Sequence, residues 1–238
     1  MIRFLVKTLV FFIDVLYKNR TYPRFYVLET VARVPYFSFL SVLHLYETLG
    51  LWRKADWLKV HFAETWNELH HLLIMESLGG NAHWGDRLFA RTSALIYYWV
   101  VVVLYLASPR SAYAFMEQVE EHAFHTYDGF LKSDGEQLKS LSAPAVALNY
   151  YSNGDLYMFD EFQTSRKPEG RRPVIENLYD VFVAIRDDEG EHVKTMVACQ
   201  SVDAQENFKS PHSMLPTANT EPAVVAVLPS VFPVLPTL

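Results

Sequence analysis

The chain has 238 residues, half of them hydrophobic, and a formal net charge of -6. A chain of this length is expected to form one sizeable domain, and its acidic balance argues against nucleic acid as a partner. Cys199 is the only cysteine, which excludes a disulfide framework and a thiolate metal cluster. Any metal would therefore be held by carboxylate and imidazole groups, a donor set that suits iron or manganese.

The mean hydropathy is just above zero, which is high for a soluble protein, but the long apolar runs of a multi-spanning membrane protein are missing. This combination predicts a protein that lies on a membrane. Residues 1–20 are expected to form an amphipathic helix at the membrane surface, with a core helix as the alternative. No transit peptide is visible there, which favours a prokaryotic source unless a presequence was removed.

The second predicted helix begins at Tyr22-Pro23 and ends near Leu49, where Gly50 offers a stop. Pro35 is expected to kink this helix. Glu29 lies on its apolar face. It is therefore the first candidate for a buried carboxylate that stands alone on its helix.

The third predicted helix covers residues 54–78 and contains Glu68 and His71. Residues three apart lie on one face of a helix, so these two side chains are expected to point the same way. Leu72 and Met75 continue that face as an apolar stripe. An ordinary surface pair is the alternative for this motif taken alone.

The most hydrophobic segment, residues 94–107, would extend about 21 Å as a helix, short of a hydrocarbon core of about 30 Å. A crossing here would also place the next helix on the opposite side of the bilayer from Glu68. Residues 87–107 are therefore predicted to lie in one membrane leaflet, with their aromatic residues at headgroup level. A buried bundle helix is the alternative.

The fifth predicted helix, residues 109–131, carries Glu120 as the second lone carboxylate, with Tyr127 two turns away on the same face. Periodicity alone does not choose Glu120 over Glu117 or Glu121. A short helix is expected over residues 135–141.

Residues 144–173 contain several turn sequences and are predicted to form a long loop. The sixth helix, residues 174–200, carries Glu189 and His192, again three residues apart. Residues 203–238 are rich in proline and are expected to be a mostly disordered tail. The prediction is thus one helical domain over residues 1–202, followed by this tail.

A Glu-x-x-His motif is expected by chance about 0.6 times in a chain of this composition, so two occurrences are weak evidence by themselves. Their apolar neighbours make it stronger, because a buried carboxylate needs a cation, a donor or a proton. In ferritin-like bundles, two such motifs and two lone Glu residues hold a pair of metal ions. The predicted fold is therefore all-α, a ferritin-like four-helix bundle with a di-iron carboxylate centre. Nearby acids and imidazoles remain alternatives: Glu64, Glu76, Glu117, Glu121, Glu191, His61, His70, His122 and His125.

Four stretches of the chain resemble the four motifs of the alternative oxidases, in particular the branch of plastid terminal oxidases. They are Leu28–Phe37, Asn67–His71, Glu120–Asp128 and Arg186–His192. Segments 160–165 and 171–180 are similar to the plastid branch and not to the mitochondrial enzymes. Two departures are His122, where mitochondrial members have Glu, and Gly190, where Ala is usual.

The resemblance implies a role for each matching residue. Two iron ions would be held by Glu29, Glu68, His71, Glu120, Glu189 and His192. Asn67 and Asp188 would orient these ligands. Tyr127 would take part in catalysis, and a quinol pocket would be lined by Arg24, Leu28 and Thr126.

The function implied is oxidation of plastoquinol and reduction of oxygen to water, without proton pumping. The expected setting is one face of a thylakoid or equivalent membrane, with membrane lipid in contact and a homodimer as the assembly. Two alternatives remain open: a di-iron hydroxylase acting on a quinone or lipid, and a non-catalytic iron-binding protein of the membrane surface.

Overall fold

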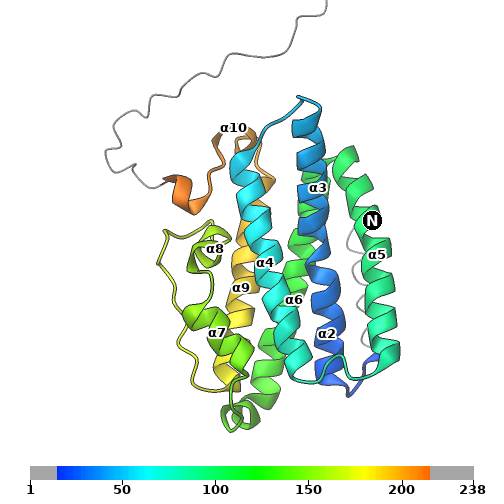
Figure 1. Ribbon diagram of the computed structural model, residues 1–238, viewed down its shortest axis with the longest axis vertical. Coiled ribbons are helices and arrows are strands. Elements are labelled where there is room, and N and C mark those ends of the chain that lie inside the picture. Colours follow the sequence, from blue (N-terminus) through cyan, green and yellow to red (C-terminus); the bar gives the residue numbers. More distant parts are fainter. Residues whose placement is uncertain (1–14, 215–238) are drawn as a thin grey trace, which may run out of the picture.

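The computed structural model describes residues 15–214, and they form helices with no strand among them (Figure 1). The all-α prediction is therefore confirmed. The elements in chain order are α2 (Thr21–Ala32), α3 (Val34–Thr48), α4 (Ala55–Ser77), α5 (Trp84–Ala107), α6 (Pro109–Lys139), α7 (Ala145–Asn153), α8 (Leu156–Glu161), α9 (Leu178–Cys199), α10 (Ala204–Asn207) and the 3₁₀ helix η1 (Pro211–Met214).

Four long helical units form the bundle: α2 continued by α3, then α4, α6 and α9 (Figure 1). α6 packs along α9, while α2 and α3 pack between α4 and α5. The predicted four-helix bundle is thus confirmed. Its interior contains two clusters of apolar side chains, one around Phe25 and Phe182 and one around Phe39 and Tyr113.

The predicted kink lies at Arg33, which separates α2 from α3. Pro35 falls in the first turn of α3. It has no N–H to donate to the carbonyl of Val31, and its ring crowds that carbonyl, so the α2 hydrogen-bond ladder cannot continue past it. Arg33 itself keeps helical dihedral angles, and the chain therefore bends without leaving the bundle.

The end of α4 is fixed by Gly79 and Gly80. Gly79 has φ 83°, and its N–H donates to Glu76 O while the Gly80 N–H donates to Met75 O, which is a Schellman ending. A Cβ at Gly80 would lie 2.7 Å from Tyr22 O. Glycine at this position therefore lets the end of α4 contact the start of α2.

α5 begins at Trp84 and has 24 residues, or about 36 Å. It is one helix, among the described residues, that is long and apolar enough to cross a membrane. The argument that this segment is too short to cross was therefore wrong, because the helix starts well before the most hydrophobic run. The other argument, that a crossing would separate the next helix from Glu68, is unaffected. α5 lies along the side of the bundle next to α2 and α3.

Two predictions for the middle of the chain were wrong. α6 continues to Lys139 and absorbs the separate helix expected over residues 135–141. Gly135 does not interrupt α6, and its open side is covered by the ring of Tyr179. The long loop expected over residues 144–173 contains α7 and α8, whose buried aromatic residues dock on α4 and supply the stability that short helices lack alone.

α9 begins at Leu178, four residues later than predicted, because Asn177 and Asp180 form a capping box.

Residues 204–214, within the predicted tail, form α10 and η1. Phe208 packs on Trp57 with ring centroids 5.5 Å apart, which anchors this segment on α4. Residues 1–14 and 215–238, which include most of the predicted surface helix and most of the predicted tail, lie outside the described residues.

Candidate metal centre

The six carboxylate and imidazole residues predicted as ligands come together in the middle of the bundle. α2 contributes Glu29, α4 contributes Glu68 with His71, α6 contributes Glu120, and α9 contributes Glu189 with His192. All six side chains are buried, with at most 2% of their surface exposed. Helices far apart in sequence therefore converge on one polar site inside an apolar core.

The ligand atoms fall into two groups of four, and Glu68 and Glu189 belong to both. One group adds Glu29 and His71, the other adds Glu120 and His192, and within each group the atoms lie within 4.8 Å of one another. Two carboxylates shared between two groups are the arrangement expected for bridging ligands in a site for two metal ions.

Each imidazole is aimed at a shared carboxylate of the other helix. His192 Nδ1 lies 2.9 Å from Glu68 Oε1, and His71 Nδ1 lies 3.2 Å from Glu189 Oε1. This pairing makes α4 and α9 near-symmetric halves of the site. The two Glu-x-x-His motifs, weak evidence as sequence patterns, meet each other in space.

The polar atoms of the site fit a pair of metal ions. Several ligand atoms are buried and have no hydrogen-bond partner among the described residues, namely both oxygens of Glu68 and Glu189, one oxygen of Glu29 and of Glu120, and Nδ1 of His71 and His192. Burying a charged group without a partner costs about several kcal/mol in a protein interior. Divalent cations would satisfy all of these atoms with oxygen and nitrogen donors.

The raised pKa values of two carboxyls in the cluster also favour metal binding. Burial, followed by repulsion from Glu189, raises the pKa of the Glu68 and Glu120 carboxyls well above the usual range. A cluster of carboxyls that holds its protons without metal would exchange them for metal ions, since ligand carboxylates must be deprotonated.

The choice between neighbouring acids on α6, open from periodicity, is resolved by burial. Glu120 is fully buried and faces the cluster. Glu121 is exposed, and Glu117 is partly exposed and accepts a hydrogen bond from Gln200. On α9, Glu191 points away from the cluster toward Arg166, Ser165 and Lys194.

Comparison with known proteins now adds to this geometry. Residues 1–201 match the family model described as "Alternative oxidase". The chain belongs to the alternative oxidase family. The resemblance stated from its motifs is therefore confirmed.

The chain is 61% identical over 226 residues to "Ubiquinol oxidase 4, chloroplastic/chromoplastic" of Arabidopsis thaliana, and the match covers 95% of the chain and 64% of the relative. It is 31% identical over 180 residues to "Ubiquinol oxidase, mitochondrial" of Mangifera indica, covering 75% of the chain and 50% of the relative. The higher identity to the chloroplast protein agrees with the predicted plastid branch. The chain spans about half to two thirds of the length of these relatives.

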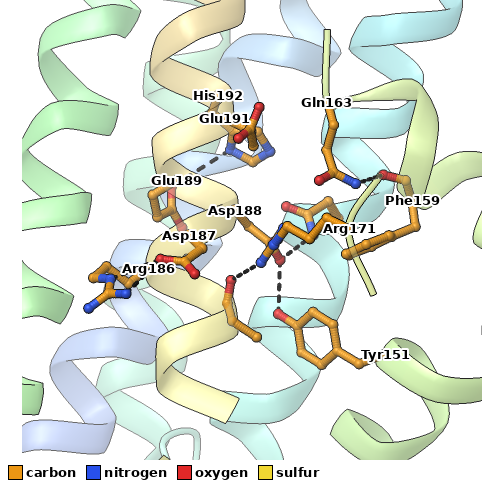
Figure 2. Close-up of polar contacts among 12 residues, drawn as sticks. Tyr151, Phe159, Gln163, Arg171, Arg186, Asp187, Asp188, Glu189, Glu191 and His192 are labelled. Carbon is orange, nitrogen blue, oxygen red and sulfur yellow. Dashed lines mark hydrogen bonds and ion pairs between the residues drawn. The ribbon is translucent and has the colours of Figure 1, made fainter. Parts of the chain in front are cut away.

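Of the two residues predicted to orient the ligands, Asn67 and Asp188, it is Asp188 that contacts His71. Its Nε2 lies 3.0 Å from Asp188 Oδ2, and the same oxygen accepts hydrogen bonds from Asn67 and Tyr151. Arg171 bonds the other Asp188 oxygen, and Figure 2 shows Tyr151 and Arg171 both pointing to Asp188 from outside α9. The sequence reasoning missed Tyr151 and Arg171, because they come from the segment predicted as a loop.

Two tyrosines contact ligands of the site. Tyr127, predicted to take part in catalysis, donates a hydrogen bond to Glu29. Tyr36 donates to Glu120 Oε1 at 2.5 Å and was not predicted. Its spacing of seven residues from Glu29 is the signal that could have found it, because seven residues are about two helical turns.

The three predicted quinol-contacting residues are only partly brought together. Arg24 and Thr126 line one cavity of about 550 Å³, together with Phe25, His125 and Phe130. Leu28 is not among its lining residues and is partly buried against the core. Thr126 bonds back to His122 through both its carbonyl and its ring nitrogen.

Proposed function

We propose that this alternative oxidase is a membrane-bound enzyme that oxidises plastoquinol and reduces oxygen to water at two iron ions, without pumping protons. The observation that carries the proposal is the pair of four-ligand groups sharing Glu68 and Glu189. The relatives named above as ubiquinol oxidases support a quinol as the electron donor.

The iron pair would be held by Glu29, Glu68, His71, Glu120, Glu189 and His192. When bound, it would transfer electrons from quinol to oxygen. Carboxylate and imidazole donors suit iron. The one cysteine of the chain, Cys199, is buried at the end of α9 and belongs to neither ligand group, so the site has no thiolate.

The protein's own residues supply orientation and protons. Asp188 accepts the Nε2 hydrogen of His71 and so keeps Nδ1 aimed at the cluster. Glu68 and Glu189 each reach both groups, so either carboxylate can change its binding mode without leaving the site. The hydroxyl of Tyr127, bonded to Glu29, can deliver a proton and an electron at the metal pair.

The cavity beside Arg24 and Thr126 is the proposed quinol site. Phe25 lines this cavity and stacks on Tyr127, with ring centroids 4.6 Å apart. A quinol head group in the cavity would therefore be separated from Tyr127 by a single aromatic ring. We also propose Leu28, which packs against the core beside Phe25, as an apolar contact of the quinol.

The membrane-facing surface is proposed to be the outer side of α5. Large apolar side chains are exposed there, including Leu95, Trp99 and Val103 at 64%, 60% and 63%. They repeat every four residues and so form one stripe. With α5 in one leaflet, the whole bundle stays on one side of the bilayer, and nothing in this arrangement carries protons across it.

The chloroplast relative supports a thylakoid or equivalent photosynthetic membrane. Residues 1–202 are proposed as a single di-iron domain, with residues 1–20 on the membrane surface and residues 87–107 embedded in it. A homodimer is proposed as the assembly.

The test is turnover of iron-loaded protein in detergent with a decyl-plastoquinol and oxygen labelled with ¹⁸O. Label recovered only in water, with two quinols consumed per oxygen molecule, is the expected result. Label in the quinone product would replace the proposal with the hydroxylase reading. Iron binding without quinol-dependent oxygen uptake would replace it with the non-catalytic reading. Acidification of the lumen of sealed vesicles during turnover would refute the absence of pumping.

A further inference from the structure

A second group of buried polar side chains lies beside the metal centre, and the reaction proposed above does not use it. His61 of α4 and Tyr113 of α6 are both fully buried. His61 Nε2 lies 2.8 Å from Tyr113 Oη, and His61 Nδ1 lies 2.7 Å from Glu64 Oε2. Tyr113 Oη also lies 2.8 Å from the hydroxyl of Tyr105 on α5.

Aromatic rings connect this group to a metal ligand. Tyr36 donates its hydroxyl to Glu120 Oε1 at 2.5 Å, and its ring centroid is 6.2 Å from that of His61. Phe39 provides a second link, with ring centroids 6.2 Å from Tyr36 and 4.9 Å from Tyr113. Tyr113 is therefore joined to the metal centre by successive ring contacts inside the core.

The resting state of His61 allows it to accept a proton. Burial lowers the pKa of His61 to about 3, so the imidazole is neutral at physiological pH. In one orientation of the hydrogens, Tyr105 donates to Tyr113, Tyr113 donates to His61 Nε2, and Nδ1–H donates to Glu64. A tyrosine with such an acceptor can lose an electron and a proton together, which avoids leaving a charged phenol in a medium that penalises charge.

We propose that Tyr113 is a second redox site, which gives one electron to the metal centre through Tyr36 and its hydroxyl proton to His61. This inference rests on the proposed function, because the oxidant is the oxidised metal centre produced by the reaction with oxygen.

The step balances as one electron and one proton. The O–H bond of Tyr113 breaks, and Tyr113 becomes a neutral phenoxyl radical. The metal centre gains the electron, and His61 Nε2 gains the proton. His61 passes its Nδ1 proton to Glu64 in the same step and so stays neutral, because burial lowers the pKa of His61 and raises the pKa of Glu64. When quinol next reduces the metal centre, an electron returns to Tyr113 and the proton returns to its hydroxyl.

The use of such a site follows from electron counting. Reduction of oxygen to water takes four electrons, and one quinol supplies two. When a second quinol is late, Tyr113 supplies an electron that would otherwise be taken from a ligand or a neighbouring side chain. The site would thus protect the centre when quinol is scarce.

The test uses protein loaded with ferrous iron, treated with hydrogen peroxide, freeze-quenched and examined by electron paramagnetic resonance. Peroxide supplies the oxidising equivalents, so quinol is not needed. All samples carry Tyr127→Phe, which removes any radical on that residue, and contain ring-deuterated or ordinary tyrosine. Tyr113→Phe keeps the ring packing, His61→Gln removes the proton acceptor, and Tyr46→Phe is the matched control on α3.

The expected result is a tyrosyl radical in the parent that narrows on ring deuteration and shows an exchangeable hydrogen coupling lost in D₂O. Tyr113→Phe should reduce it at least tenfold, His61→Gln should lower its yield and lifetime, and Tyr46→Phe should leave it unchanged. No radical in the parent, or a radical that persists in Tyr113→Phe, would overturn the inference. Iron content and thermal melting check each fold, and the exchangeable coupling tests the pair even if a variant fails to fold.

Oxygen uptake with quinol is measured on the same preparations without Tyr127→Phe. Loss of uptake with the radical retained would overturn the proposed quinol reaction but not the redox pair. Oxygen uptake with no radical would overturn the redox pair but not the proposed quinol reaction.

Discussion

His71 and Asp188, 117 residues apart in the chain, are joined by a hydrogen bond of 3.0 Å between Nε2 and Oδ2. This bond fixes the tautomer of a proposed iron ligand. Asp188→Asn should therefore weaken iron binding about 10- to 100-fold, the usual effect of losing such a partner. Competition with a chelator measures the affinity. Asp187→Asn is the control, because Asp187 is partly exposed and pairs only with Arg186 among the ion pairs of the described residues. Equal affinities in the two variants would contradict the role given to Asp188.

Arg171 neutralises the buried carboxylate that holds His71. Burial raises the pKa of Asp188, but Arg171 and His71 more than offset it and keep that pKa below the usual range. Arg171→Met removes the guanidinium from beside a fully buried carboxylate, and it should lower the free energy of unfolding by about 3–5 kcal/mol. Chemical denaturation measures this loss.

Lys132→Met is the matched control for that variant. It removes an exposed partner of Asp128 on α6, and such a surface ion pair contributes little to stability. If Arg171→Met were no more destabilising than Lys132→Met, Arg171 would not be needed to compensate Asp188.

The metal-free protein should lose stability as the pH rises. The pKa of Glu68 and of Glu120 is raised by burial first and by Glu189 second. Above the ordinary Glu pKa of about 4.3, the folded state therefore binds more protons than the unfolded chain, so the free energy of unfolding falls with rising pH. Iron needs the deprotonated carboxylates, so its stabilising effect grows over the same range.

Melting temperatures with and without ferrous iron, measured under nitrogen at several pH values, check this prediction. The gap between the two curves should widen from about pH 5 to about pH 8. Parallel curves would mean that the cluster does not exchange protons for metal.

Membrane attachment should depend on the exposed stripe of α5. Leu95→Glu combined with Val103→Glu places two charges on that stripe, and we expect binding to liposomes of thylakoid lipid composition to fall at least tenfold. Val202→Glu is the control, because Val202 is 86% exposed but lies after α9. Cosedimentation gives the bound fraction. Undiminished binding of the double variant would place the membrane contact elsewhere.

Local spacing was enough to predict that Glu and His of each Glu-x-x-His motif point the same way, because residues three apart lie on one face of any α-helix. It was not enough to choose Glu120, since Glu117, Glu120 and Glu121 all lie within about one turn and only the packing of α6 against α9 separates them.

Other parts of the site depend on contacts between distant segments. Arg171 reaches Asp188 from a stretch full of turn residues, where α7 and α8 are too short to leave a periodic signal. Tyr36 contacts Glu120 across 84 positions of sequence. Spacing from Glu29 could have placed Tyr36 on the side of the site, but neither its contact with Glu120 nor that of Arg171 with Asp188 follows from spacing along one helix.

The central claim is tested most directly by oxygen uptake of iron-loaded protein with decyl-plastoquinol, comparing Glu120→Gln with Glu121→Gln. The two variants make the same change one residue apart on α6, at a buried and an exposed carboxylate. The account predicts quinol-dependent uptake in the wild type and in Glu121→Gln, and a loss of at least 100-fold in Glu120→Gln, about 2.7 kcal/mol in the barrier. Full activity of Glu120→Gln, or no quinol-dependent uptake in the wild type, would contradict it.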